Sequence, residues 1–140
     1  MPFSVKIYRF ISILIVPFTN FFLFLRVLRN KDDKSRKKER FGISKIQNNN
    51  NEIIWFHAAS VGETLSILPI VKILSENQSN ILITTVTQTS SSIISKRFPK
   101  SVVHQYVPFD SPLYIKRFLS NWNPKIAIFI ESEIWPNLII

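Results

Sequence analysis

Residues 57–63, which read HAASVGE, place a histidine, a serine and a glutamate around a turn of small residues. The turn follows the apolar run 53–56 and precedes a helical pattern, so it joins a strand to a helix. The alanines and Gly62 keep the turn narrow, which lets a ligand approach the backbone. A turn that brings Glu63 to a helix start above a strand end is a recurrent way of building an active site.

Three further apolar runs also end in polar or turn residues. The second ends in threonines that include Thr85 and Thr87, the third is followed by Pro-Phe-Asp with Asp110, and the fourth is followed by Glu131-Ser132-Glu133. In a parallel sheet, ligands bind beyond the carboxyl ends of the strands. These segments therefore predict one shared site at the edge of the sheet where the strands have their carboxyl ends, which we call the rim.

Each segment also has a purely structural interpretation. Ser60 and Glu63 have the spacing of a capping box, in which two side chains satisfy each other's backbone amides at a helix start. Asp110 or Ser111 could cap a helix that begins at Pro112, and the threonines could favour a strand and cap the next helix. His57 alone is more often a hydrogen-bonded packing residue than a base.

Apolar runs alternate with amphipathic stretches from residue 51 onward. Pro69 must kink or restart the first of the expected helices. Continuous apolar strands separated by helices predict an α/β fold with a Rossmann-like parallel sheet covered on both faces. The expected strands are 53–56, 80–86, 101–107 and 126–130, and the expected helices are 62–76, 89–98, 111–122 and one that opens at Glu133.

The composition argues against several kinds of site. The chain has no cysteine and two histidines, so we expect no disulfide and no metal site. Its two glycines, Gly42 and Gly62, cannot form a dinucleotide fingerprint, so a nicotinamide or flavin cofactor is disfavoured. We expect no cofactor.

The basic charge of the chain belongs to its N-terminal end. Residues 1–30 carry four basic and no acidic side chains, and residues 31–40 carry six basic and three acidic ones. The remaining hundred residues are nearly neutral, with eight basic and six acidic side chains. Charge confined to one end argues against a nucleic-acid partner.

Residues 1–29 are predicted to be a hydrophobic membrane-anchor helix. Residues 10–25 carry no charge and are bordered by Arg9 and Arg26, with a basic cluster following. Such clusters stay on the cytoplasmic side and attract anionic headgroups. The run is short for a perpendicular span, so the helix either spans the bilayer or lies in its interface. No small-residue cleavage site follows the apolar run, which argues against a cleaved signal peptide. The remaining alternative is a buried N-terminal helix.

Residues 30–51 are expected to be a basic, asparagine-rich linker. Neither its charged run nor its asparagine run can bury enough apolar surface to fold alone. Residues 52–140 then form the Rossmann-like domain.

Five segments together resemble the 3-deoxy-D-manno-octulosonic acid (Kdo) transferases. They are KERFG, IIWFHAASVGE, ITTVTQTS, YVPFD and ESEIWPN, in the order and approximate spacing of that family. The resemblance covers essentially the whole chain. Two departures are mild: Ser90 stands where the family often has glycine, and residues 131–134 read ESEI where the family favours Glu-Thr-Glu-Leu.

The resemblance implies an inverting, metal-independent glycosyltransferase of the two-domain GT-B type. The donor would be CMP-Kdo and the acceptor a lipid A precursor of lipopolysaccharide synthesis, at the cytoplasmic face of the inner membrane of a Gram-negative bacterium. Glu63 would be the general base. The implied substrate-binding residues are Ser60, Gly62, Thr85, Thr87, Asp110, Glu131, Glu133 and, toward acceptor phosphates, Arg40.

The length implies that about a third of such an enzyme is present, namely an incomplete acceptor domain without the donor domain. Residues 1–140 alone are therefore expected not to turn over. The alternative function is a noncatalytic membrane-bound remnant or interaction module.

Overall fold

The computed structural model describes residues 3–29, 32–49, 51–130 and 135–139. Four parallel strands form one sheet in the order β3-β2-β1-β4. The central pair, β1 and β2, is in register from Ile53 opposite Asn80 to His57 opposite Thr84. The strands are β1 (Ile53–His57), β2 (Asn80–Thr85), β3 (Val103–Tyr106) and β4 (Ile126–Phe129). The predicted α/β fold with a parallel sheet is confirmed, with strand ends shifted by up to two residues.

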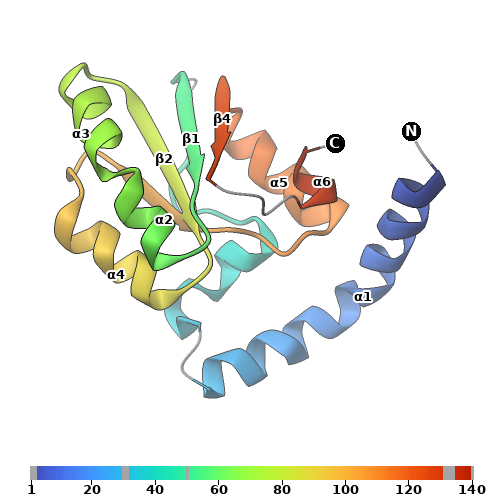
Figure 1. The fold of residues 1–140 in the computed structure, drawn as a ribbon. Coiled ribbons are helices and arrows are strands. Elements are labelled where there is room, and N and C mark those ends of the chain that lie inside the picture. The colour runs from blue at the N-terminus through green and yellow to red at the C-terminus, as the bar shows by residue number, and fades with distance from the viewer. Residues whose placement is uncertain (1–2, 30–31, 50, 131–134, 140) are drawn as a thin grey trace.

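Helices cover both faces of the sheet (Figure 1). The single pattern predicted for 62–76 forms two helices, because Pro69 lies in the first turn of the second and restarts the path. The helices of the domain are α2 (Val61–Ser66), α3 (Leu68–Glu76), α4 (Gln88–Arg97), α5 (Pro112–Trp122) and α6 (Pro136–Ile139).

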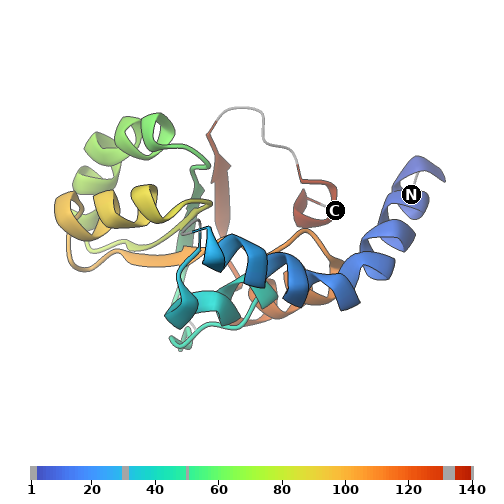
Figure 2. The same ribbon diagram turned by 90° about the horizontal axis from the view of Figure 1, so that it is seen from below.

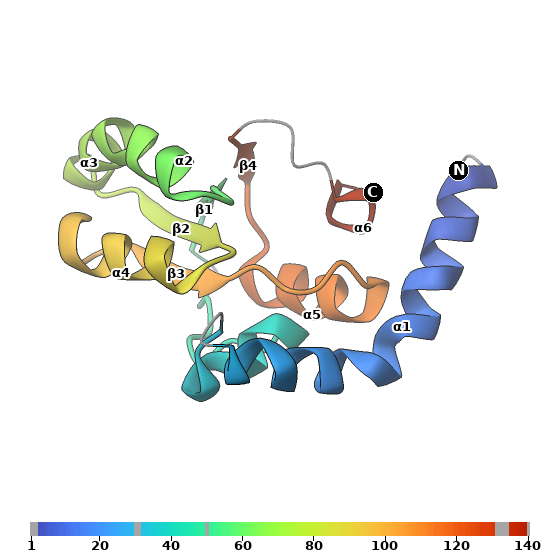
Figure 3. The same ribbon diagram turned by 60° about the horizontal axis from the view of Figure 1, so that its bottom comes forward.

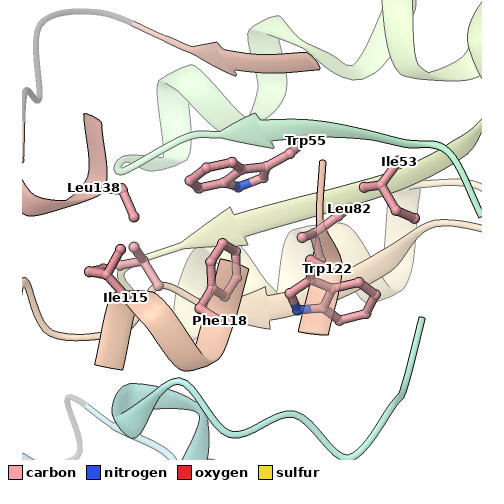
Figure 4. Packing of buried hydrophobic residues seen from close by; sticks show 8 residues of the cluster. Ile53, Trp55, Leu82, Ile115, Phe118, Trp122 and Leu138 are labelled. Atoms are coloured by element: carbon pink, nitrogen blue, oxygen red, sulfur yellow. The ribbon is translucent and has the colours of Figure 1, made fainter. Parts of the chain in front are cut away.

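Two apolar cores lie on the two faces of the sheet. Alternate residues of β1 point to opposite sides, so Trp55 packs against α5 and Phe56 packs with the helices of the other face. The ring centroids of Trp55 and Phe118 are 5.0 Å apart, in the centre of the first core (Figure 4). These cores fix the strand ends in space.

The segment expected to be a linker is partly folded. Residues Lys34–Phe41 form a 3-10 helix, η1, that begins at the cap Asp33 and ends at Gly42. Gly42 has φ +73° and a Cβ there would lie 2.1 Å from the carbonyl oxygen of Tyr114, so only glycine fits. The composition of the segment cannot build a core of its own, but η1 packs on the core of the domain.

The N-terminal helix α1 (Phe3–Leu28) is long and apolar enough to cross a membrane, by length and composition only. It runs along the outside of the domain, in contact with α5 and α6 (Figures 2 and 3). Its path is an arc, with Pro17 inside the helix (Figure 1). Thr19 and Leu23 are its only buried residues among those described, which differs from the alternative of a buried N-terminal helix.

Candidate functional site

The strand order places a topological switch point between β1 and β4. The chain leaves β1 toward β2 and β3 on one side, and β4 then pairs with the other side of β1. In open α/β sheets, ligands bind in the crevice beyond the carboxyl ends of the strands at such a point. The segment 57–63 follows β1 at this position, so the switch point is the candidate site.

Glu63 lies in the first turn of α2 and has one engaged carboxylate oxygen. Its Oε2 accepts a hydrogen bond from the backbone N–H of Ala59 at 2.7 Å. Within the described part of the chain, Oε1 has no hydrogen-bond partner, and the side chain is half-buried. The capping contact thus fixes the direction of the carboxylate and leaves one oxygen for a ligand.

Ser60 and Gly62 shape the turn below Glu63. Ser60 is the N-cap of α2, and its Oγ accepts from the backbone N–H of Glu63 at 3.2 Å. A Cβ at Gly62 would meet only Ser60 Oγ, at 3.9 Å, so the protein interior does not require glycine there. One half of the predicted capping box is therefore present, whereas the Glu63 carboxylate accepts from the N–H of Ala59 and not from that of Ser60. The space beside Gly62 is open.

His57 lies beneath the rim in a fixed orientation. Its Nδ1 is 2.9 Å from Thr84 Oγ1, which also accepts from the indole N–H of Trp55. The imidazole is fully buried, and its Nε2 has no partner among the described residues. Burial lowers the pKa of His57 to about 4, although the charge of Glu63 opposes this shift. His57 is therefore neutral at pH 7 and supports the rim as a packing residue.

The two threonines of the predicted site have different surroundings. Thr85 is fully buried, and its Oγ1 is 2.9 Å from Nε2 of His104. Thr87 is half-buried, caps α4 and accepts from the backbone N–H of Ser90 at 3.2 Å. Of the two, Thr87 is the one whose side chain reaches the surface.

Asp110 joins the rim to α1 and α6. Its Oδ2 accepts from the phenol of Tyr8 at 2.7 Å and from the backbone N–H of Asn137 at 3.2 Å. Burial and this contact with Asp110 raise the pKa of Tyr8 to about 12, so the phenol remains a donor. Sequence reasoning did not single out Asn137, although it stands in the quoted segment ESEIWPN.

Arg40 is the main difference from the sequence analysis, which expected it to meet acceptor phosphates. Its side chain is 3% exposed and its guanidinium pairs with Asp32 Oδ1 at 2.6 Å. It also donates to the carbonyl oxygens of Val86 and Val107, which directly follow β2 and β3. The guanidinium therefore holds the strand ends, and its hydrogen bonds within the described part of the chain go to Asp32, Val86 and Val107.

Glu131 and Glu133 lie outside the described residues. The described residues contain no group of three His, Cys, Asp or Glu side chains that could hold a metal ion, and the absence of a metal from the reaction stays a prediction.

The fold and the rim define an α/β domain with a carboxylate at the switch point of a parallel sheet. Residues 35–140 match the family described as 3-deoxy-D-manno-octulosonic-acid transferase (kdotransferase), in its N-terminal region. The chain belongs to this family.

Individual relatives support the same family assignment. The chain is 43% identical to a 3-deoxy-D-manno-octulosonic acid transferase of Rickettsia bellii over 136 residues, which are 96% of this chain and 32% of the relative. It is 30% identical to the protein of the same name from Rickettsia typhi, over 95% of this chain and 39% of the relative. A third such relative, from Haemophilus influenzae, is 43% identical over 61% of this chain and 21% of the relative. The chain thus spans about a third of the length of the first of these relatives.

Proposed function

We propose that residues 1–140 form the acceptor-side portion of an inverting glycosyltransferase. The enzyme transfers Kdo from CMP-Kdo to a lipid A precursor in lipopolysaccharide synthesis, at the cytoplasmic face of the inner membrane. Membership of the Kdo transferase family supports the reaction. The observation that carries the site is the Glu63 carboxylate at the switch point, which is held by one oxygen and whose other oxygen has no hydrogen-bond partner among the described residues.

In this proposal Glu63 is the general base. An acceptor hydroxyl oxygen forms a bond to the anomeric carbon of Kdo, and its proton passes to Oε1 of Glu63. The bond between the anomeric carbon and the phosphate oxygen breaks at the same time, and CMP leaves with the electron pair. Direct displacement inverts the anomeric centre and needs one positioned base on the attacking side.

The structure of the turn supports this role through preorganisation. The hydrogen bond from Ala59 fixes one carboxylate oxygen, so the Glu63 side chain loses little orientational freedom when the acceptor binds. The open space beside Gly62 would let a sugar approach the backbone, and Ser60 and Thr87 offer hydroxyl groups at two neighbouring helix starts. Glu131 and Glu133, which follow β4 in the sequence, are proposed as further substrate-binding residues.

In this proposal Asp110 and Thr85 position the loops of the rim. Asp110 fastens the loop after β3 to Tyr8 and Asn137, and Thr85 is fully buried beside His104. We leave Arg40 out of the acceptor contacts because its guanidinium already binds Asp32 and two backbone carbonyls.

The substitution Glu63→Gln tests the proposed base. Glutamine retains an oxygen that can accept from Ala59 but has no basic carboxylate, so a purely capping role would survive. In a chimera of residues 1–140 with the remaining part of the Rickettsia bellii relative, transfer from CMP-Kdo should fall by about 10²–10⁴-fold. The melting temperature should stay nearly unchanged.

Glu76→Gln is the matched control, because Glu76 is an exposed glutamate at the far end of α3. This control should keep the rate of the parent chimera. Activity of the Glu63→Gln chimera within a few-fold of the parent would limit Glu63 to its capping role.

A further inference from the structure

Helix α1 is attached to the domain along most of its length. The first attachment is at Tyr8 and the last is at Arg26, eighteen residues later, which corresponds to about 27 Å of helix. The contacts pair Tyr8 with Asp110, Arg9 with Asn137, Thr19 with Tyr114, Phe22 with Phe109, and Arg26 with Asp32. A helix held in this way lies along the domain and does not project from it.

Helix α1 exposes more apolar surface than a helix of a water-soluble protein usually does. Its hydrogen bonds and its ion pair to the domain come from polar side chains, Leu23 is the one buried apolar residue among its described residues, and most of its large apolar side chains are exposed. Eight of the exposed apolar residues recur every three or four positions and form a stripe along the helix, called the outer stripe: Phe3, Ile7, Phe10, Leu14, Phe18, Phe21, Phe24 and Leu28. Ile11, Ile13, Ile15 and Phe22 are exposed beside this stripe. An apolar stripe of this length marks a contact with an apolar partner.

The next segment, η1, sorts its charges in a matching way. The acidic side chains of Asp32 and Glu39 are buried, while Lys34, Lys37 and Lys38 are exposed. A run of mixed charge in the sequence therefore presents mainly cations to the outside. This surface complements anionic headgroups.

A bilayer interface fits both surfaces. A spanning helix is surrounded by hydrocarbon or by other membrane segments over a core about 30 Å thick. A domain with exposed charged residues instead contacts one side of α1 at Tyr8 and at Arg26, which are about 27 Å apart along the helix. Between these contacts an apolar pocket separates the helix from the domain. The domain cannot enter the hydrocarbon core because its exposed charges would lose their hydration.

We propose that α1 lies in the plane of the membrane interface and does not cross the bilayer. Its outer stripe dips into the acyl boundary, and Lys34, Lys37 and Lys38 of η1 contact anionic headgroups beside it. Asp110, through its bond to Tyr8, ties the rim of the candidate site to this surface at a fixed distance. The proposal concerns attachment alone and does not depend on the transfer reaction.

Single cysteines test the topology directly, because the chain has no cysteine of its own. Ser4 is exposed near the start of α1, and Ser35 is exposed in η1. The full chain carrying Ser4→Cys or Ser35→Cys is produced in a Gram-negative bacterium. A membrane-impermeant maleimide is then added to intact spheroplasts or to inside-out vesicles.

An in-plane helix predicts that both variants are labelled in inside-out vesicles and protected in spheroplasts. A spanning helix places the two positions on opposite sides. Labelling of the Ser4→Cys variant in spheroplasts, or in neither preparation until detergent is added, would overturn the proposal.

Vesicle binding tests the headgroup contact. The triple substitution of Lys34, Lys37 and Lys38 by Gln should weaken binding to vesicles of phosphatidylcholine mixed with phosphatidylglycerol by on the order of 100-fold. Binding to phosphatidylcholine alone should change little. The control substitutes Lys72, Lys96 and Lys100, which are exposed on or beside α3 and α4, away from α1 in Figure 1. An equal loss in both triple variants would refute the lysine surface.

Discussion

At the scale of single residues, the rim combines open and buried polar groups. One carboxylate oxygen of Glu63 has no hydrogen-bond partner among the described residues, while the imidazole of His57 is fully buried and His104 is half-buried. Both imidazoles bind threonine hydroxyls, and burial makes their charged forms unfavourable. The histidines are therefore structural groups whose neutrality contributes to the stability of the fold.

This neutrality predicts acid sensitivity. Burial lowers the pKa of His57 to about 4 and that of His104 to about 3, from 6.5 in the unfolded chain. Between these values the unfolded state binds more protons, so the free energy of unfolding rises with pH. The stabilisation is complete above pH 6.5 and is lost as pH falls toward the folded pKa values. The slope is at most about 1.4 kcal/mol per pH unit for each histidine.

Urea unfolding between pH 4 and pH 7 measures this slope. The His104→Asn variant removes one titrating group and should reduce the slope toward that of a single histidine. A variant that keeps the slope of the parent would show that His104 is not the group responsible.

At the scale of elements, η1 covers the open edge of β3. Glu39 Oε2 accepts from the backbone N–H of Tyr106 at 2.8 Å, and Arg36 donates to the carbonyl oxygen of His104 at 2.9 Å. Arg40 adds the carbonyl oxygen of Val107, just past the strand. Side chains of η1 thus satisfy the backbone groups that an edge strand would otherwise offer to another chain.

We predict that Arg40→Lys destabilises the domain although the charge is retained. A single ammonium group cannot reach Asp32 and both carbonyl oxygens in the fork geometry of a guanidinium. Disruption of a buried charge pair of this kind costs about 3–5 kcal/mol, and the partial replacement should cost a large fraction of that. Chemical denaturation gives the change in unfolding free energy.

Lys38→Gln is the neighbouring control, since Lys38 is exposed and its replacement should stay within about 0.5 kcal/mol. Equal stability of the Arg40→Lys variant and the parent would show that the strand ends do not depend on the guanidinium.

At the scale of the whole molecule, a series of polar contacts joins helix α1 to the candidate site. Tyr8 of α1 binds Asp110 beyond β3, and Arg26 near its other end binds Asp32, which in turn holds Arg40. Arg40 then reaches the residues that follow β2 and β3. The rim therefore has a defined position relative to the lipid surface that we propose.

The proposed division of labour predicts different behaviour for the chain and for a chimera. Residues 1–140 alone should bind membranes but transfer no Kdo, because the proposal assigns donor binding to a domain outside this segment. The chimera with the remaining part of the Rickettsia bellii relative should transfer Kdo from CMP-Kdo to a lipid A precursor. Radiolabelled donor and chromatography of the lipid product measure both. Transfer by residues 1–140 alone would refute the assignment of the donor site.

The sequence by itself determined the sheet, the position of Glu63 and the family. Apolar runs and their turns depend on local patterning, so the four strands and the restart at Pro69 could be predicted. The roles of Arg40 and Asp110 required the tertiary structure, because their partners are up to 102 positions away in the chain. The role of η1 also required the tertiary structure. Its polar composition does not reveal that it covers the edge of β3, because that contact forms only in the folded domain. Which side of α1 contacts the domain was likewise decided by packing, since an apolar segment with few polar residues does not specify its partner.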